Sequence, residues 1–263
     1  RGVPLAHPGA DGQRKLMKKR PQAARQGRLQ GKVVVVTGGS RGIGLAIAEA
    51  LAAEGCAVVL AGRAARALQA ATRQVERHGV AVLARRCDVR DPKSVAALFA
   101  AVRHRFRRLD ILINNAGIAH PLRNVEKLPV RKWREVLDTN LTGMFLCAQA
   151  AIPLMRRGAA IVNNLSVSAR QVFPGNAAYD ASKHGALGLT RTLREELRPR
   201  GIRVIALLPG ATATDIWDQF WPTAPRGRMI SPADVAAMVV ETVVLPAGTT
   251  VEELVIAPTR GAL

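Results

Sequence analysis

A strand-like run that passes through a glycine-rich turn directly into a helix-like run constrains this chain more than any other feature. Residues 33–36 are four consecutive valines, which favour a buried strand. Gly38, Gly42 and Gly44 follow, and residues 45–52 are mostly strong helix formers. Such a turn places backbone N–H groups at a helix N-terminus, where a phosphate can bind. The Gly-x-x-x-Gly-x-Gly spacing is not the most common dinucleotide fingerprint, so a tight turn without a ligand remains the alternative.

Short apolar runs alternate with helix-like stretches along the rest of the chain. We expect strands at residues 33–37, 57–61, 81–85, 111–113, 160–165, 203–207 and 253–256. We expect helices at residues 42–54, 65–78, 92–106, 131–155, 177–198 and 232–245. This alternation implies right-handed βαβ units. The sequence therefore predicts an α/β fold, a single Rossmann-like doubly wound parallel sheet of about seven strands with helices on both faces, whose ligand lies beyond the carboxyl ends of the strands.

The composition is consistent with this fold and also bears on membrane insertion, on the redox compartment and on metal binding. Apolar residues make up 48% and aromatic residues only 3% of 263 residues, so the core is aliphatic, as in parallel sheets covered by helices. No apolar run approaches the roughly 20 residues that span a membrane. The three scattered cysteines, Cys56, Cys87 and Cys147, favour buried free thiols in a reducing cytoplasm. No His, Cys or carboxylate spacing suggests a metal site.

The formal net charge of +20 raises the question of a nucleic-acid partner. Part of the charge lies in residues 1–30, which we predict to be a disordered basic leader before a single domain at residues 31–263. Met17 is a candidate natural start within that leader. Another part lies between Arg63 and Arg108, a span that lacks an aromatic platform and a nucleic-acid motif. We therefore expect solvated arginines and an anionic cofactor rather than a nucleic-acid partner.

Polar residues at predicted strand ends indicate which cofactor the sheet would bind. An acidic residue at the end of the second strand is typical of NAD sites, but here Gly62 and Arg63 stand there. Together with Arg41 in the glycine turn, Arg63 favours a 2′-phosphate and so NADP; two solvated arginines are the alternative. Asp88 and the Asn-Asn pair that begins at Asn114 follow the next two strands, where they could reach the same ligand.

Tyr179 and Lys183 form the candidate chemical centre. They lie four residues apart and so share one helix face. A phenol titrates near about 10, and a neighbouring ammonium would favour its phenolate, which makes a usable general acid–base group. Ser166 ends the preceding strand and could donate a hydrogen bond to a carbonyl oxygen. Ser168 is a rival for that role, but the spacing to Tyr179 favours Ser166.

Taken together and in their order along the chain, these residues resemble the short-chain dehydrogenase/reductase family from about residue 31 to about residue 259. The matching motifs are Thr37-Gly38-x-x-x-Gly42-x-Gly44, Asp88, Asn114-Asn115-Ala116-Gly117, Asn140, Ser166, Tyr179-x-x-x-Lys183, Pro209-Gly210 and Thr214. Each motif alone is a weak signal for this family, but the whole set in this order is highly specific for it. The resemblance implies an NADP(H)-dependent oxidoreductase, with NADPH preferred over NADH, that interconverts a secondary alcohol and a ketone or aldehyde. It also implies a homodimer or homotetramer formed through the helices at residues 131–155 and 177–198.

The resemblance further implies roles for individual residues. Tyr179 would exchange the proton with the substrate oxygen, and Ser166 would orient the carbonyl. Lys183 would hold the nicotinamide ribose and lower the pKa of Tyr179, and Asn140 would help to hold a water that links Lys183 to solvent. The implied cofactor-binding residues are Gly38, Ser40, Arg41, Gly42, Ile43, Gly44, Arg63, Asp88, Val89, Asn114, Ala116, Gly117, Tyr179, Lys183, Pro209, Gly210, Thr212 and Thr214.

The sequence constrains the identity of the substrate less than it constrains the class of reaction. The end of the chain lacks the Gly-rich Asp-Gly-Gly ending of ketoacyl-carrier-protein reductases and is more similar to the NADP-dependent 3-hydroxy acid or serine dehydrogenase-like branch. A 3-oxoacyl thioester reductase, a steroid-type dehydrogenase and a non-catalytic NADP-binding regulator remain the alternatives. An apolar lid over a small carbonyl pocket is expected at residues 215–229, unless its aromatic residues pack against the body or a neighbouring subunit. The expected pocket residues are Trp217, Phe220, Trp221, His120, Leu122, Val172 and Phe173, with His120 at the rim.

Overall fold

The computed structural model describes residues 27–261, and these residues form one seven-stranded sheet. The strand order is β3-β2-β1-β4-β5-β6-β7, and every neighbouring pair is parallel. The strands are β1 (Val33–Thr37), β2 (Ala57–Gly62), β3 (Val82–Arg86), β4 (Leu109–Asn114), β5 (Met155–Asn164), β6 (Arg203–Pro209) and β7 (Glu253–Ile256). The predicted doubly wound parallel sheet is confirmed. The order reverses between β1 and β4, where sheets of this kind open a crevice for a ligand.

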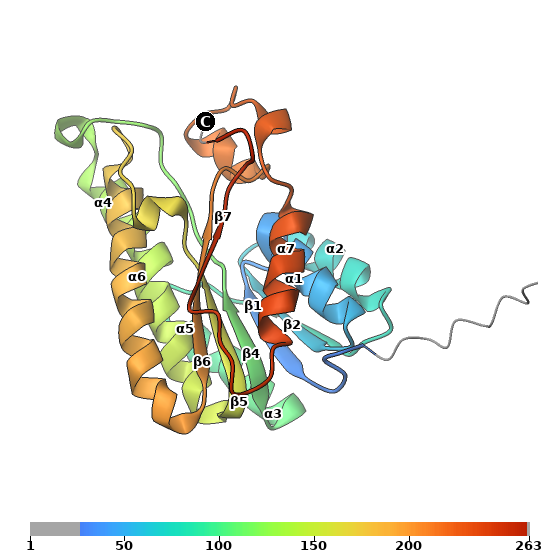
Figure 1. Ribbon diagram of the computed structural model, residues 1–263. Helices are drawn as coiled ribbons and strands as arrows, with labels where there is room; N and C mark the ends of the chain where they lie inside the picture. The colour runs from blue at the N-terminus through green and yellow to red at the C-terminus, as the bar shows by residue number, and fades with distance from the viewer. Residues whose placement is uncertain (1–26, 262–263) are drawn as a thin grey trace, which may run out of the picture.

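Helices cover both faces of the sheet (Figure 1). The α-helices are α1 (Gly42–Ala53), α2 (Ala65–Glu76), α3 (Pro92–Phe106), α4 (Val130–Leu137), α5 (Gly143–Ala151), α6 (Ala177–Leu197) and α7 (Pro232–Val243). The first apolar core lies between the sheet and α1, α2 and α7, and the second lies between the sheet and α3, α5 and α6. The sheet is therefore the middle layer of three.

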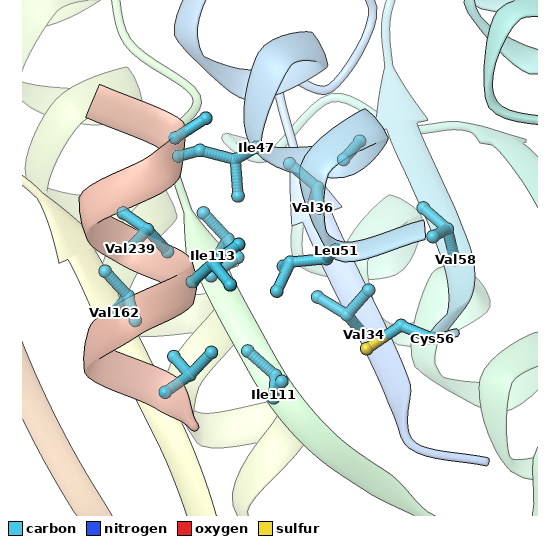
Figure 2. Packing of buried hydrophobic residues seen from close by; sticks show 14 of the residues in the cluster. Val34, Val36, Ile47, Leu51, Cys56, Val58, Ile111, Ile113, Val162 and Val239 are labelled. Carbon is cyan, nitrogen blue, oxygen red and sulfur yellow. The ribbon is translucent and has the colours of Figure 1, made fainter. Parts of the chain in front are cut away.

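The valines of β1 divide between the two cores because successive side chains of a strand point to opposite faces. Val34 and Val36 pack in the core that contains Ile47 and Leu51 of α1, as Figure 2 shows. Val33 and Val35 pack in the other core. All four valines are at most 4% exposed. A continuous apolar run is what a strand buried on both faces requires.

The single helix expected at residues 131–155 is wrong. After α4, a π-helical turn at Asp138–Thr142 leads into α5, and a 3-10 turn at Ile152–Leu154 leads into β5. A π-turn inserts an extra residue into a helix, and such turns occur often at functional sites. Pro153 lacks the N–H that would continue α5, so the chain leaves the helix there and β5 begins at Met155. This places Asn140 inside the irregular turn.

Most of the predicted leader, and Met17 with it, lies outside the described residues. Its last residues, 27–30, are described and belong to the folded structure. Leu29 is 6% exposed in the first core, and its N–H donates to the Glu54 carbonyl at 2.9 Å. Arg28 pairs with Glu54 and with Glu241. Within residues 27–261, no helix is long and apolar enough to cross a membrane.

Candidate active site

A cavity of about 890 Å³ lies beyond the carboxyl ends of the strands, where the sheet order predicts a ligand. Segments that follow β1 to β6 contribute to its wall. Most of the predicted site residues line it: Gly38, Ser40, Arg41, Gly42, Ile43, Arg63, Asp88, Val89, Ala116, Gly117, Ser166, Tyr179, Lys183, Pro209, Gly210, Thr212 and Thr214. Of the predicted catalytic and cofactor-binding residues, three do not line it: Gly44, Asn114 and Asn140.

The glycine turn between β1 and α1 leaves room and free N–H groups for an anion. Gly38 and Gly42 have positive φ angles of 62° and 56°. A Cβ on Gly44 would lie only 2.4 Å from the Gly38 carbonyl oxygen, so Gly44 permits the tight turn rather than lining the cavity. The N-cap residue Arg41 makes no capping hydrogen bond through its side chain, and the first turn of α1 carries no acidic residue. These features fit a bound phosphate.

Arg41 and Arg63 both line the cavity with exposed side chains. Arg41 contacts Asp215 at 3.5 Å, and both side chains are 64% exposed. Exposed ion pairs of this kind contribute little stability, so Arg41 is available to a stronger anionic partner. Arg63 lies close enough to Asp88 to help lower the pKa of that carboxyl.

Asp88 lies at the cavity wall, where the sequence places it, but it also has a protein partner. Arg90 donates to both carboxylate oxygens, at 2.6 to 3.1 Å, and this hydrogen bonding is the main cause of the lowered pKa of Asp88. Sequence reasoning missed Arg90. An arginine two residues after a strand-end aspartate is the signal that was available. The pairing holds the Asp88 carboxylate ionised and fixed in position.

Asn114 does not line the cavity, whereas its neighbour Asn115 does. The side chain of Asn114 is 3% exposed and donates to Asn163 Oδ1 at 2.9 Å between two strands of the sheet. Asn115 has left the strand, and its Nδ2 donates to the carbonyls of Thr37 and Gly38 at 3.0 and 3.1 Å. Asn115 therefore ties the end of β4 to the glycine turn.

Tyr179 and Lys183 lie on α6 with Lys183 Nζ 5.4 Å from the centre of the Tyr179 ring. Ser166 follows β5 and hydrogen-bonds Tyr179 through its side chain. Ser166 Oγ also accepts from the Ser168 N–H at 3.1 Å. The rival Ser168 hydrogen-bonds Asp180 instead. This arrangement favours Ser166 over Ser168 as the serine that meets a ligand beside Tyr179.

The protein groups around Tyr179 raise its pKa rather than lower it. Burial raises the pKa of Tyr179 to about 12, against a smaller lowering by the Ser166 hydrogen bond. Burial also lowers the pKa of Lys183 to about 8. Lys183 is not among the groups that shift the pKa of Tyr179, contrary to our expectation. Its Nζ donates to the Asn164 carbonyl at 3.0 Å, so its charge is directed at a neighbouring strand end.

Asn140 is fully buried in the π-turn and acts on the loop after β4. Its Nδ2 donates to the Ile118 carbonyl and to Ser182 Oγ, each at 3.0 Å, and its Oδ1 accepts from the Ile118 N–H at 2.9 Å. Both side-chain hydrogens are therefore used inside the protein. A water held by Asn140 for Lys183 would have to use Oδ1 or the main chain.

The aromatic residues expected at the substrate end pack together along the cavity. The Trp217 ring lies 4.7 Å from that of Phe220 and 6.1 Å from that of Trp221. Leu122 and Phe173 line the cavity as well, whereas Val172 and His120 do not. His120 is 1% exposed and its Nδ1 hydrogen-bonds the Pro121 carbonyl, so its expected place at the pocket rim is wrong. Among the described residues, no cluster of three His, Cys, Asp or Glu could hold a metal ion.

With this geometry established, comparison with known proteins identifies the family. The family model described as short chain dehydrogenase matches residues 32–224, and the chain belongs to this family of oxidoreductases. A 3beta-hydroxysteroid dehydrogenase of Mediterraneibacter gnavus is 38% identical over 73% of this chain and 70% of its own length. A 3-oxoacyl-[acyl-carrier-protein] reductase of Synechocystis is 36% identical over 80% of this chain and 88% of its own length.

Solved structures of the family show the same fold. An alcohol dehydrogenase of Thermococcus sibiricus, complexed with 5-hydroxy-NADP, superposes with a TM-score of 0.81 at 31% identity. The match covers 87% of this chain and 97% of the other. A short-chain dehydrogenase of Burkholderia cenocepacia in complex with NADP gives the same TM-score at 35% identity, over 88% of this chain and 98% of the other. The chain is therefore an enzyme that acts on CH–OH or carbonyl groups.

Proposed function

We propose that this protein is an NADP(H)-dependent oxidoreductase that interconverts a secondary alcohol and a ketone or aldehyde. One observation carries the proposal. Ser166, Tyr179 and Lys183 line one cavity together with the glycine turn and the exposed guanidinium groups of Arg41 and Arg63. A proton-exchanging group and an anion-binding turn in one cavity are what hydride exchange with a dinucleotide requires.

The chain's own residues hold the substrate oxygen and move its proton. Ser166 Oγ donates a hydrogen bond to the carbonyl oxygen and polarises it. Tyr179 is protonated at neutral pH and gives its hydroxyl proton to that oxygen during reduction; in oxidation it takes the proton back. Lys183 lines the same cavity, and its ammonium would hold the ribose hydroxyls beside the nicotinamide when the cofactor is bound. NADPH, when bound, supplies the hydride.

The preference for NADPH over NADH rests on the arginines. Gly62 stands where an acidic residue would bind a free ribose 2′-hydroxyl, and Arg63 follows it. Arg41 is available to a stronger anion than Asp215. Two guanidinium groups suit a 2′-phosphate by charge and by geometry. Two solved relatives, from Thermococcus sibiricus and Burkholderia cenocepacia, are complexes with 5-hydroxy-NADP and NADP, which supports the same choice.

We also propose that the protein forms a homodimer or homotetramer and is located in the cytoplasm. Trp133 on α4 and Phe145 on α5 are 37% and 43% exposed, which fits a homodimer or homotetramer that buries these helices. The three cysteines are free and buried, as expected in a reducing cytoplasm.

Consumption of NADPH and, separately, of NADH across a panel of carbonyl compounds tests the reaction. The panel contains 3-oxo acids, acetoacetyl thioesters, diketones, aromatic aldehydes and cyclic ketones, including steroid ketones. Tyr179→Phe is the blank, because it removes the proton donor and keeps the ring. We expect turnover with NADPH that disappears in the blank. Full activity in the blank would contradict the mechanism. A protein that binds NADPH and DNA without turnover, with a DNA affinity that falls steeply with salt, would be a regulator instead.

A further inference from the structure

The substrate end of the cavity is built from apolar side chains of three separate segments. The loop after β4 contributes Leu122, the segment after β5 contributes Phe173, and the segment after β6 contributes Trp217, Phe220 and Trp221. Two of the three tryptophans, two of the five phenylalanines and the single tyrosine of the chain line this cavity. In a chain with 3% aromatic residues, this concentration indicates a large apolar ligand surface.

Within residues 27–261, no cation that lines the cavity belongs to the three segments that carry these apolar side chains. Among the described residues, the charged side chains that line the cavity are Arg41, Arg63, Asp88, Lys183 and Asp215. Arg41 pairs with Asp215 beside the glycine turn, and Asp88 lies with Arg63 at the ends of β2 and β3. Lys183 donates to the Asn164 carbonyl. The described wall around the aromatic cluster therefore offers a carboxylate substrate no cation of its own.

The polar groups at this end are uncharged amides. Gln219 and Gln171 both line the cavity. Gln219 Oε1 accepts from the Ala119 N–H at 3.2 Å, which joins the aromatic segment to the loop after β4 and leaves the Gln219 Nε2 hydrogens for a ligand. An amide can hydrogen-bond a neutral oxygen, but it does not repay the desolvation of a carboxylate.

Large apolar side chains also stand at the edge of the cavity. Leu122 is 49% exposed and Trp221 is 39% exposed, and both line the cavity. The Arg123 N–H donates to the Gly175 carbonyl at 2.9 Å, so Leu122 lies beside the segment that contains Val172, which is 75% exposed. An apolar edge around an apolar wall is suited to the entry of an apolar molecule.

We propose that the substrate is a neutral ketone, or the matching secondary alcohol, with a ring or a similarly bulky apolar group next to the reacting carbon. Carboxylate-bearing substrates are selected against. This inference rests on the proposed function, because it assigns the substrate class of the same site. It departs from the hydroxy acid branch that the end of the chain resembles, since that class would need a cation beside the aromatic cluster.

Four 2-oxo compounds separate charge from bulk: methyl benzoylformate, benzoylformate, methyl pyruvate and pyruvate. We expect kcat/KM with NADPH to be at least about tenfold higher for each ester than for its acid, because the site provides no partner for the acid's charge. We also expect methyl benzoylformate to exceed methyl pyruvate by about tenfold or more, because only the phenyl ring fills the aromatic wall. Acids reduced as well as their esters, or small esters as well as large ones, would overturn the proposal.

A substitution at the edge of the cavity tests the charge argument by improving the use of carboxylate substrates. Leu122→Lys places a cation where the proposal finds none, so the ester-to-acid ratio of kcat/KM should fall several-fold. Val125→Lys is the matched control, because Val125 is 73% exposed and does not line the cavity. Equal ratios in wild type, Leu122→Lys and Val125→Lys would count against the charge argument.

A binding measurement keeps this test independent of turnover. Trp133 is the one tryptophan of the sequence outside the cavity, so in a Trp133→Phe background the fluorescence reports Trp217 and Trp221. In the presence of NADP, methyl benzoylformate should change this fluorescence at a lower concentration than benzoylformate. No turnover of any carbonyl would refute the proposed function, whereas equal binding of ester and acid would refute the substrate class alone.

Discussion

Asn164 Nδ2 donates to Asn115 Oδ1 at 2.8 Å, and this hydrogen bond joins the two ends of the candidate site. Asn115 is fixed in orientation because its own Nδ2 donates to the carbonyls of Thr37 and Gly38. The main-chain oxygen of Asn164 accepts from Lys183 Nζ at 3.0 Å. The glycine turn that would hold the cofactor phosphates is thus connected to the lysine of α6 through two asparagines.

Replacing Asn164 by leucine should loosen this connection. The Asn115 Oδ1 atom would lose its partner in a part-buried place, which costs about 1–3 kcal/mol of the free energy of unfolding. Urea denaturation measures that loss. We also expect a higher KM for NADPH and a lower kcat, because the turn and Lys183 would no longer be held together. Asn124→Leu is the control, since Asn124 is exposed outside the cavity, and an equal effect there would argue against the connection.

Burial of Lys183 should make stability depend on pH in a specific range. Its pKa is about 8 in the folded protein against 10.5 for the free group, so between these values the unfolded chain binds more protons. Stability therefore rises as the pH increases from about 8 to about 10.5, by roughly 3 kcal/mol in all, and this gain is lost again as the pH falls from about 10.5 to about 8. Urea denaturation of wild type and Lys183→Met at several pH values isolates this contribution. Parallel curves for the two proteins would contradict the lowered pKa.

The raised pKa of Tyr179 should give the two directions of the reaction different dependences on pH. At neutral pH the phenol is protonated, which is the form that reduction of a carbonyl needs. Oxidation of an alcohol needs the phenolate, whose population rises with pH up to the pKa. Initial rates should therefore increase steeply with pH for alcohol oxidation and vary little for carbonyl reduction between about pH 6 and pH 8. Both directions should be measured with saturating cofactor and with Tyr179→Phe as the blank.

The sheet and the shared helix of Tyr179 and Lys183 could be predicted because local sequence determines them. The valines of β1 need burial on both faces, and the spacing from Tyr179 to Lys183 places both on one face of any helix. The glycine turn also follows from sequence, because Gly38 and Gly42 adopt positive φ angles that other residues avoid.

The side-chain positions that could not be predicted from the sequence depend on contacts between segments that are distant along the chain. Asn114 turns away from the cavity because Asn163, on the adjacent strand, accepts its hydrogen bond. The π-turn in the expected long helix surrounds Asn140, whose side chain binds Ile118 on another loop. Neither partner is visible in the local sequence. His120 is similarly buried by the tertiary structure, although the sequence predicts it at the rim of the pocket.

The cofactor preference can be tested by reversing one charge. Arg63→Asp would place a carboxylate where the 2′-phosphate is expected and near Asp88, so it should repel NADPH and accept a free ribose hydroxyl. We expect the KM for NADPH to rise at least about tenfold, while the KM for NADH stays the same or falls. Arg66→Asp makes the same charge change at an exposed residue that does not line the cavity. If both variants weaken NADPH equally, the effect is that of net charge; if Arg63→Asp alone reverses the preference, Arg63 binds the phosphate.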